Sequence, residues 1–312
     1  MDIEDLDEFD CREALKADPH NPAAHLRLGQ IALERGGLAE AESHFLCLSE
    51  RLDQAGGPLL MLGEVLQLQG RLDEAELAFQ RAVKLEPDRA SHWTALGLFY
   101  LSAPPSLELA QASFTRATEL DEHSAQNWQY LGQALIPIRP EEAVKALTRA
   151  VKLDGQSAEA HFFLGLARYQ LKDIQAACDL YQRALQLDSQ RAGWWDQLGG
   201  LYLDHLEDAA LARNAFARAL QCPDADETYA RANLFWACLT LGDLPEAKAL
   251  RPDLVELEPV GLALCDAGLT VMAEGVEAAR VELERLSKDP QVEGDYEIDW
   301  TRLRRLVEKK TI

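Results

Sequence analysis

The sequence lacks a long apolar run, and its basic residues are few. No stretch approaches the roughly 18 to 20 continuous apolar residues of a membrane-spanning helix. The 31 Lys and Arg side chains face 53 Asp and Glu side chains, which leaves a formal net charge of −22. Proteins that bind nucleic acid or anionic membranes need a basic surface, so this balance argues against both partners. It permits a basic protein partner and is equally compatible with simple solubility.

Paired cysteines and a targeting signal are also missing. The six cysteines lie far apart in the sequence and none forms a C-x-x-C pair, so we expect reduced, structural thiols. The N-terminus reads MDIEDLDEFD, whereas a secretory signal has a basic start and an apolar run. These features predict a cytoplasmic protein.

Motifs that carry chemistry are absent as well. The seven histidines are spread over the chain, without an H-E-x-x-H motif or a Cys/His cluster of zinc-binding spacing. There is no phosphate-binding glycine loop and no G-x-S-x-G motif. The sequence therefore predicts a protein that is not an enzyme and that uses no metal or cofactor.

The dominant feature that is present is an internal repeat. A Leu-Gly pair recurs six times, and the successive glycines are 34, 34, 35, 33 and 34 residues apart. A drift of one residue fits a loop that tolerates small changes in length. Periods of this size are typical of stacked helical hairpins, each of which buries its apolar face only against a neighbour.

Each period continues with an Ala-x-x-x-aromatic pair, such as Ala41 and Phe45, and the fourth period has Ala143 and Leu147 instead. The apolar residues around these pairs follow the three- and four-residue spacing of helices. We expect each glycine to let the two helices of a hairpin approach closely, with the aromatic ring filling the remaining gap.

These residues resemble the tetratricopeptide repeat family, whose signature begins W-x2-L-G-x2-Y. Two periods match that part in full, Trp93-Leu96-Gly97-Tyr100 and Trp195-Leu198-Gly199-Tyr202. The resemblance extends over about residues 22 to 259. It implies an all-α, right-handed superhelical solenoid of about seven to eight helix-turn-helix hairpins with a C-terminal capping helix. His25 and His161 stand where other periods have Trp, so we expect both to pack between helices.

The pattern divides the chain into three segments. Residues 1–21 form an acidic N-terminal cap with a half-repeat helix, residues 22–259 an array of about seven repeats, and residues 260–312 a degenerate repeat with the capping helix. The last helix is basic and has an apolar stripe that includes Trp300 and Leu303. It either closes the final repeat or docks into the acidic surface of another copy, which would give a homo-oligomer.

The resemblance also implies a binding groove, because the first helix of every hairpin in this family lines the concave wall. The positions that face this groove carry amides, carboxylates and an apolar strip. Our candidate binding residues are Gln30, Glu64, Gln67, Leu98, Gln126, Gln129, Gln133, Phe162, Leu166, Tyr169 and Trp236, and Asp196 and Leu203 map to the same wall. Phe162 and Trp236 could instead pack between helices. The glutamines could instead form an ordinary solvated surface.

Such a wall suits a peptide or a somewhat basic amphipathic helix of another protein. The sequence therefore predicts a non-catalytic scaffold or adaptor. Two alternatives stay open: a dedicated chaperone for an assembly or export client, and a regulatory or substrate-presenting subunit of a separate enzyme.

Overall fold

The computed structural model describes residues 7–51, 55–102, 106–254 and 257–311, and every regular element in these ranges is a helix. Residues 1–6 of the acidic N-terminal segment and Ile312 lie outside the described residues. The chain divides into two compact units, Met1–Gly155 and Gln156–Ile312.

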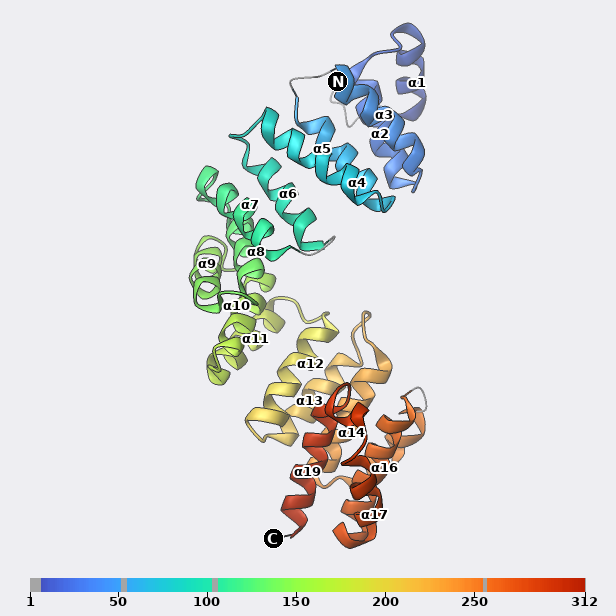
Figure 1. Ribbon diagram of the computed structural model, residues 1–312, viewed down its shortest axis with the longest axis vertical. Coiled ribbons are helices and arrows are strands. Elements are labelled where there is room, and N and C mark those ends of the chain that lie inside the picture. Colours follow the sequence, from blue (N-terminus) through green and yellow to red (C-terminus); the bar gives the residue numbers. More distant parts are fainter. Residues whose placement is uncertain (1–6, 52–54, 103–105, 255–256, 312) are drawn as a thin grey trace. The chain divides into compact units, whose positions relative to one another are not determined.

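The first unit consists of a lone helix followed by four helical hairpins (Figure 1). The lone helix α1 (Glu8–Ala17) packs on the first hairpin. The hairpins are α2 (Pro22–Glu34) with α3 (Leu38–Arg51), α4 (Gly57–Leu68) with α5 (Leu72–Leu85), α6 (Ala90–Ser102) with α7 (Leu107–Leu120), and α8 (Ala125–Leu135) with α9 (Pro140–Leu153). The second helix of one hairpin contacts the first helix of the next, so the hairpins form a stack.

The second unit contains four further hairpins and two terminal helices. The hairpins are α10 (Ala158–Gln170) with α11 (Ile174–Leu187), α12 (Ala192–Gly200) and η2 (Leu201–His205) with α13 (Ala209–Ala219), α14 (Glu227–Leu241) with α15 (Leu244–Leu250) and η3 (Arg251–Leu254), and α16 (Pro259–Glu274) with α17 (Val276–Leu286). The chain ends with α18 (Pro290–Glu293) and α19 (Glu297–Thr311). The expected all-α stack of helical hairpins is confirmed.

Glycine and aromatic residues hold each hairpin together, as the repeat predicts. A Cβ atom added to Gly199 would lie only 2.5 Å from Cε1 of Phe216, and one added to Gly97 would lie 2.6 Å from the ring of Phe114. Both rings are completely buried. The other Leu-Gly pairs make the same contact with Phe45, Phe79, Leu147 and Tyr181. The absent side chain is therefore what allows the two helices of a hairpin to approach this closely.

The turns between hairpins are fixed by the aromatic residue that opens the repeat. The indole N–H groups of Trp93, Trp128 and Trp195 each donate to the carbonyl oxygen six residues earlier, at 2.8, 3.0 and 3.0 Å. His25 stands at the same position and places Nε2 3.0 Å from the carbonyl oxygen of Pro19. His25 and His161 are both buried, which confirms that they pack between helices.

The sixth hairpin contains a π-helical turn that the repeat did not predict. Its alanine, Ala212, follows Gly199 by 13 residues, whereas Ala177 follows Gly165 by 12. The extra residue enters the first helix itself, because Leu206 donates its backbone N–H to Leu201, five residues earlier, at 3.0 Å. Single-turn insertions of this kind frequently occur at functional sites in helical proteins.

Candidate functional site

Metal clusters and membrane-spanning helices are both absent from the described residues. Across residues 7–51, 55–102, 106–254 and 257–311, no group of three or more His, Cys, Asp or Glu side chains is placed to hold a metal ion. Within the same ranges, no helix has the length and apolarity needed to cross a bilayer. Except for Trp236, the candidate binding residues lie on the exposed faces of the first helices.

In the first unit the predicted residues all lie on first helices and are exposed or half-buried. They are Gln30 on α2, Glu64 and Gln67 on α4, Leu98 on α6, and Gln126, Gln129 and Gln133 on α8. Gln67 donates to Ser102 Oγ on α6 at 2.8 Å, and Gln126 donates to Tyr130 Oη at 2.9 Å. Although Glu64 is exposed, neighbouring protein atoms desolvate its carboxylate enough to raise its pKa above the ordinary value.

An apolar hollow of about 480 Å³ lies beside these residues, near the start of α2 and α4. Pro22 and Leu26 line it from α2, and Pro58 and Met61 line it from α4. The repeat pattern did not predict this hollow, because its depth depends on how the two helices diverge.

In the second unit the predicted aromatic residues form a connected strip on the first helices. Phe162 on α10 stacks on Trp194 of α12, with ring centroids 4.8 Å apart and planes inclined by 12°. Tyr169 lies further along α10, and its hydroxyl is 3.2 Å from Nε2 of His205 on η2. Leu166 lies between them, and all three predicted residues stay partly exposed. We name Phe162, Leu166, Tyr169, Trp194 and His205 the aromatic strip.

Trp236 does not belong to this surface, and the prediction that it faces the groove is wrong. Its side chain is completely buried. The seventh hairpin lacks the Leu-Gly pair, and Phe235 occupies the glycine position. The small residue is supplied instead by α16, where a Cβ at Gly268 would lie 3.3 Å from the indole of Trp236. The ring therefore packs between first helices rather than facing solvent.

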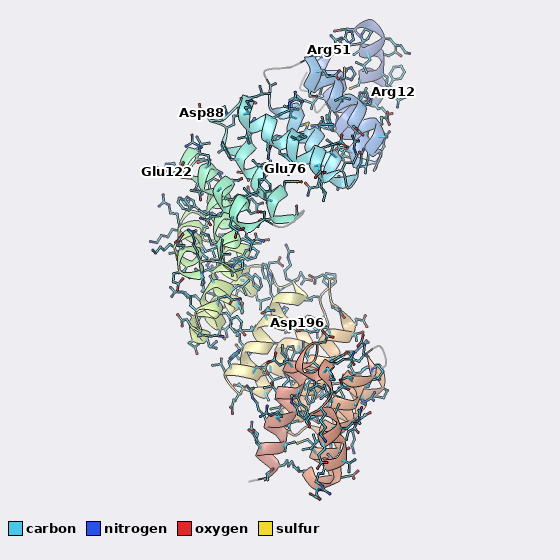
Figure 2. The ribbon with its side chains drawn as sticks, in the orientation of Figure 1. Arg12, Arg51, Glu76, Asp88, Glu122 and Asp196 are labelled. Carbon is cyan, nitrogen blue, oxygen red and sulfur yellow. The ribbon has the colours of Figure 1, made fainter. Side chains whose placement is uncertain are left out.

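A polar network crosses the inner side of the last hairpins. Asp196 on α12 is hydrogen-bonded to Asn233 on α14, and burial raises the pKa of its carboxyl to about 6 (Figure 2 labels Asp196). Asn233 accepts from Nη1 of Arg302 on α19 at 2.9 Å. Arg302 also binds Asp204 of η2 through two hydrogen bonds of 3.1 and 2.9 Å. Among these residues, sequence reasoning had assigned only Asp196 to the wall.

The sequence signal for Asp204 is weak. The spacing of 13 residues between Gly199 and Ala212 indicates an insertion, and the π-helical turn carries Asp204. However, Gly97 and Ala110 have the same spacing and α6 is an ordinary α-helix, so the spacing alone does not predict such a turn. Nothing in the repeat indicates Arg302, because it lies 98 residues further along the chain.

Comparison with known proteins agrees with this architecture. Sequence models described as "Tetratricopeptide repeat" match residues 11–46, 58–89 and 139–192. These segments are tetratricopeptide repeats, and the fold of the chain is that of a protein-interaction module built from such repeats. The comparison with curated protein sequences finds no match.

Two solved structures are similar over much of the chain. One is pilF of Pseudomonas aeruginosa, which is 19% identical, covers 75% of this chain and 98% of its own, and gives a TM-score of 0.54. The other comes from the APC/C hetero-tetramer Cut9-Hcn1, which is 17% identical, covers 94% of this chain and 56% of its own, and gives a TM-score of 0.55. At these identities the likeness is one of fold.

Proposed function

We propose that the protein is a non-catalytic, cytoplasmic scaffold or adaptor that binds a peptide or amphipathic helix of a partner protein along its first helices. The observation that carries this proposal is the aromatic strip. Phe162 and Tyr169 pack against the core of the second unit and still keep part of each ring exposed, so core packing holds an apolar surface in place on the first helices. Partly exposed aromatic rings on a preformed surface are the usual anchors of protein interfaces.

The remaining chemistry of the wall suits a segment that is apolar on one side and basic on the other. The aromatic strip offers apolar area, and the carboxylates of Asp204 and Glu207 lie next to it along the chain, one before and one after His205. In the first unit, glutamine side chains supply donors and acceptors for a peptide backbone. The net charge of −22 speeds the encounter with a basic partner more than it strengthens the complex.

The test is affinity capture from the native lysate by the intact chain, by Phe162→Ala and by Tyr169→Ala, at low and at high salt. Phe9→Ala is the matched control, because Phe9 is an aromatic residue that is 70% exposed on α1 of the first unit and is not part of the aromatic strip. We expect either strip variant to weaken retention by about tenfold or more, the usual cost of losing an interface anchor. Circular dichroism must show unchanged helix content.

The pattern of retained proteins separates the alternatives. One stoichiometric partner that is lost in both strip variants supports the adaptor. Many weak clients that high salt leaves bound indicate a general chaperone, and a retained enzyme indicates a regulatory or substrate-presenting subunit. Equal retention by Phe162→Ala, Tyr169→Ala and Phe9→Ala would refute the binding role of the strip.

A further inference from the structure

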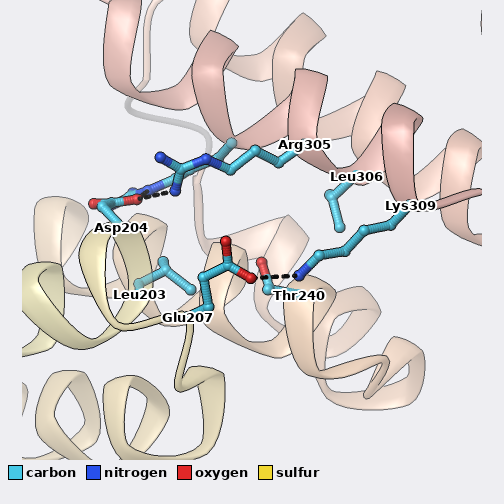
Figure 3. A pocket seen from close by; sticks show the side chains of 8 residues that line it. Leu203, Asp204, Glu207, Thr240, Arg305, Leu306 and Lys309 are labelled. Carbon is cyan, nitrogen blue, oxygen red and sulfur yellow. Dashed lines mark hydrogen bonds and ion pairs between the residues drawn. The ribbon is translucent and has the colours of Figure 1, made fainter.

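The C-terminal helix α19 lies across the inner side of the last hairpins of the second unit. It contacts the first helices α14 and α16 as well as α17. It also forms ion pairs with Asp204 of η2 and with Glu207 just after η2, two hairpins earlier than α16 (Figure 3). A helix that only closed the array would contact the last hairpin alone. The reach of α19 back to η2 therefore indicates that it occupies part of the wall formed by first helices.

Charge complementarity holds α19 in this place. The guanidinium of Arg302 is almost fully buried and binds Asp204 and Asn233. Arg305 Nη1 lies 3.8 Å from Asp204 Oδ1, and Lys309 Nζ lies 3.8 Å from Glu207 Oε2. Figure 3 shows these side chains reaching from α19 toward η2. The wall at η2 is therefore acidic where α19 presents basic residues.

The apolar part of the contact is one stripe of α19. Of its 15 residues, only Arg302, Leu303 and Leu306 are buried, and Trp300 and Val307 pack against the same core while staying partly exposed. Arg305 and Lys309 are 40% and 54% exposed, and ion pairs at such exposure contribute little. The helix itself carries five basic and three acidic side chains. It is thus a basic amphipathic helix with a narrow buried stripe, which is the kind of ligand that the wall was expected to take.

The α19 site and the aromatic strip meet at η2. Tyr169 contacts His205, and Asp204, the residue before His205, binds Arg302. A partner helix that extends along the strip past η2 reaches the side chains that α19 now uses. The two segments cannot bind Asp204 at the same time.

We propose that α19 is an intramolecular occupant of a docking site for a partner's amphipathic helix, which displaces it. The partner helix carries basic residues spaced as Arg302, Arg305 and Lys309 are, with apolar residues at the positions of Leu303 and Leu306. This inference rests on the proposed function and adds the chemical class of the partner. Because α19 is tethered, it competes at a high effective concentration and lowers the apparent affinity of the partner.

The test uses the full chain and a labelled synthetic peptide of residues 297–311 as the probe. The variant Arg305→Glu with Lys309→Glu loosens α19 but leaves Asp204, Glu207 and the buried residues in place. The control is Arg304→Glu with Lys310→Glu, which changes the same charges on exposed neighbours of the same helix. Fluorescence anisotropy gives the affinity of each chain for the peptide, and hydrogen exchange follows the α19 amides.

We expect the peptide to bind the Arg305→Glu, Lys309→Glu chain about tenfold or more tighter than the wild-type and control chains, with faster exchange of α19 in that variant alone. A peptide with Arg302→Ala should lose this binding. A smaller difference between the chains, or no binding to any of them, overturns the proposal. If the double variant loses helix content, Lys309→Glu against Lys310→Glu replaces it under the same criterion.

Two further results have definite meanings. Sedimentation of the wild-type chain as a dimer that the Arg305→Glu, Lys309→Glu chain does not form would assign the site to α19 of a second copy and would overturn its assignment to another protein. The peptide test can fail while Phe162→Ala still loses the partner. In that case the partner binds the aromatic strip without displacing α19, so the proposed function stands and only the role of α19 is overturned.

Discussion

Two neighbouring glycines in α12 provide a direct test of the packing that defines the repeat. A Cβ on Gly199 would lie 2.5 Å from Cε1 of the buried Phe216, whereas a Cβ on Gly200 would have no neighbour within 4 Å. Both residues are helical, so replacement by alanine gives each the same gain in helix propensity, about 0.5–1 kcal/mol. The difference between the two variants therefore isolates the clash with Phe216.

The clash is costly because Phe216 has no room to move. Inserting a methyl group into a packed core typically costs about 1–3 kcal/mol. The gain in helix propensity offsets part of this cost. Gly199→Ala should therefore lower the free energy of unfolding by an amount between near zero and about 2 kcal/mol. Gly200→Ala should stabilise the protein by about 0.5–1 kcal/mol. The two variants should differ by about 1–3 kcal/mol.

Urea unfolding of the full chain, followed by circular dichroism, measures this difference. α12 lies in the second unit, so the shift belongs to the unfolding transition of that unit. The midpoint of Gly199→Ala should fall below that of the wild type, and the midpoint of Gly200→Ala should rise above it. If Gly199→Ala proves as stable as Gly200→Ala, the close approach of the two helices does not depend on the missing side chain, and the reasoning fails.

Two further predictions concern buried titratable groups. Burial raises the pKa of Asp196 from 3.8 to about 6. Between pH 3.8 and pH 6 the folded chain therefore keeps a proton on this carboxyl that the unfolded chain has released. The loss of stability caused by burying the charged carboxylate is fully present only above pH 6. Asp196→Asn should therefore stabilise the protein at neutral pH by up to about 3 kcal/mol, with the gain vanishing near pH 4; a gain that does not change with pH contradicts this. Iodoacetamide at neutral pH should label Cys47 first, since it is the one cysteine that is not buried. Burial raises the pKa of the other thiols, which are Cys11, Cys178, Cys222, Cys238 and Cys265. Mass spectrometry of the folded protein follows the labelling of each cysteine. Labelling of any buried cysteine as fast as that of Cys47 would contradict this prediction.

The repeat core was predictable because its contacts are local and recur. Gly97 and Phe114 lie in one hairpin, and the same pair of positions meets in six hairpins. The partly exposed faces of Phe162 and Tyr169 follow from the same periodicity. A pattern that repeats in phase defines which side of a helix is buried, and this is the information that the sequence carries most strongly.

The remaining features depend on contacts that no repeat encodes. Trp236 is buried because Gly268 of α16 lies beside it. The last hairpins lack the regular repeat motif, so the sequence does not predict which of their residues meet. The bond between Arg302 and Asp204 joins the terminal helix to a turn 98 residues earlier. The sequence suggested a basic amphipathic last helix, but where such a helix docks depends on the shape and charge of a wall that exists only in the folded chain.

The π-helical turn of the sixth hairpin shows how a repeat protein can change its recognition chemistry at little cost. One inserted residue lies between Gly199 and Ala212, yet the ring of Phe216 still packs against Gly199 and Trp195 still fixes the preceding turn. The insertion is absorbed between Leu201 and His205, the turn that carries Asp204. Single-residue insertions at this point of a repeat thus offer evolution a means of altering ligand contacts while the scaffold stays intact, and the same point is where a designer would introduce a new specificity.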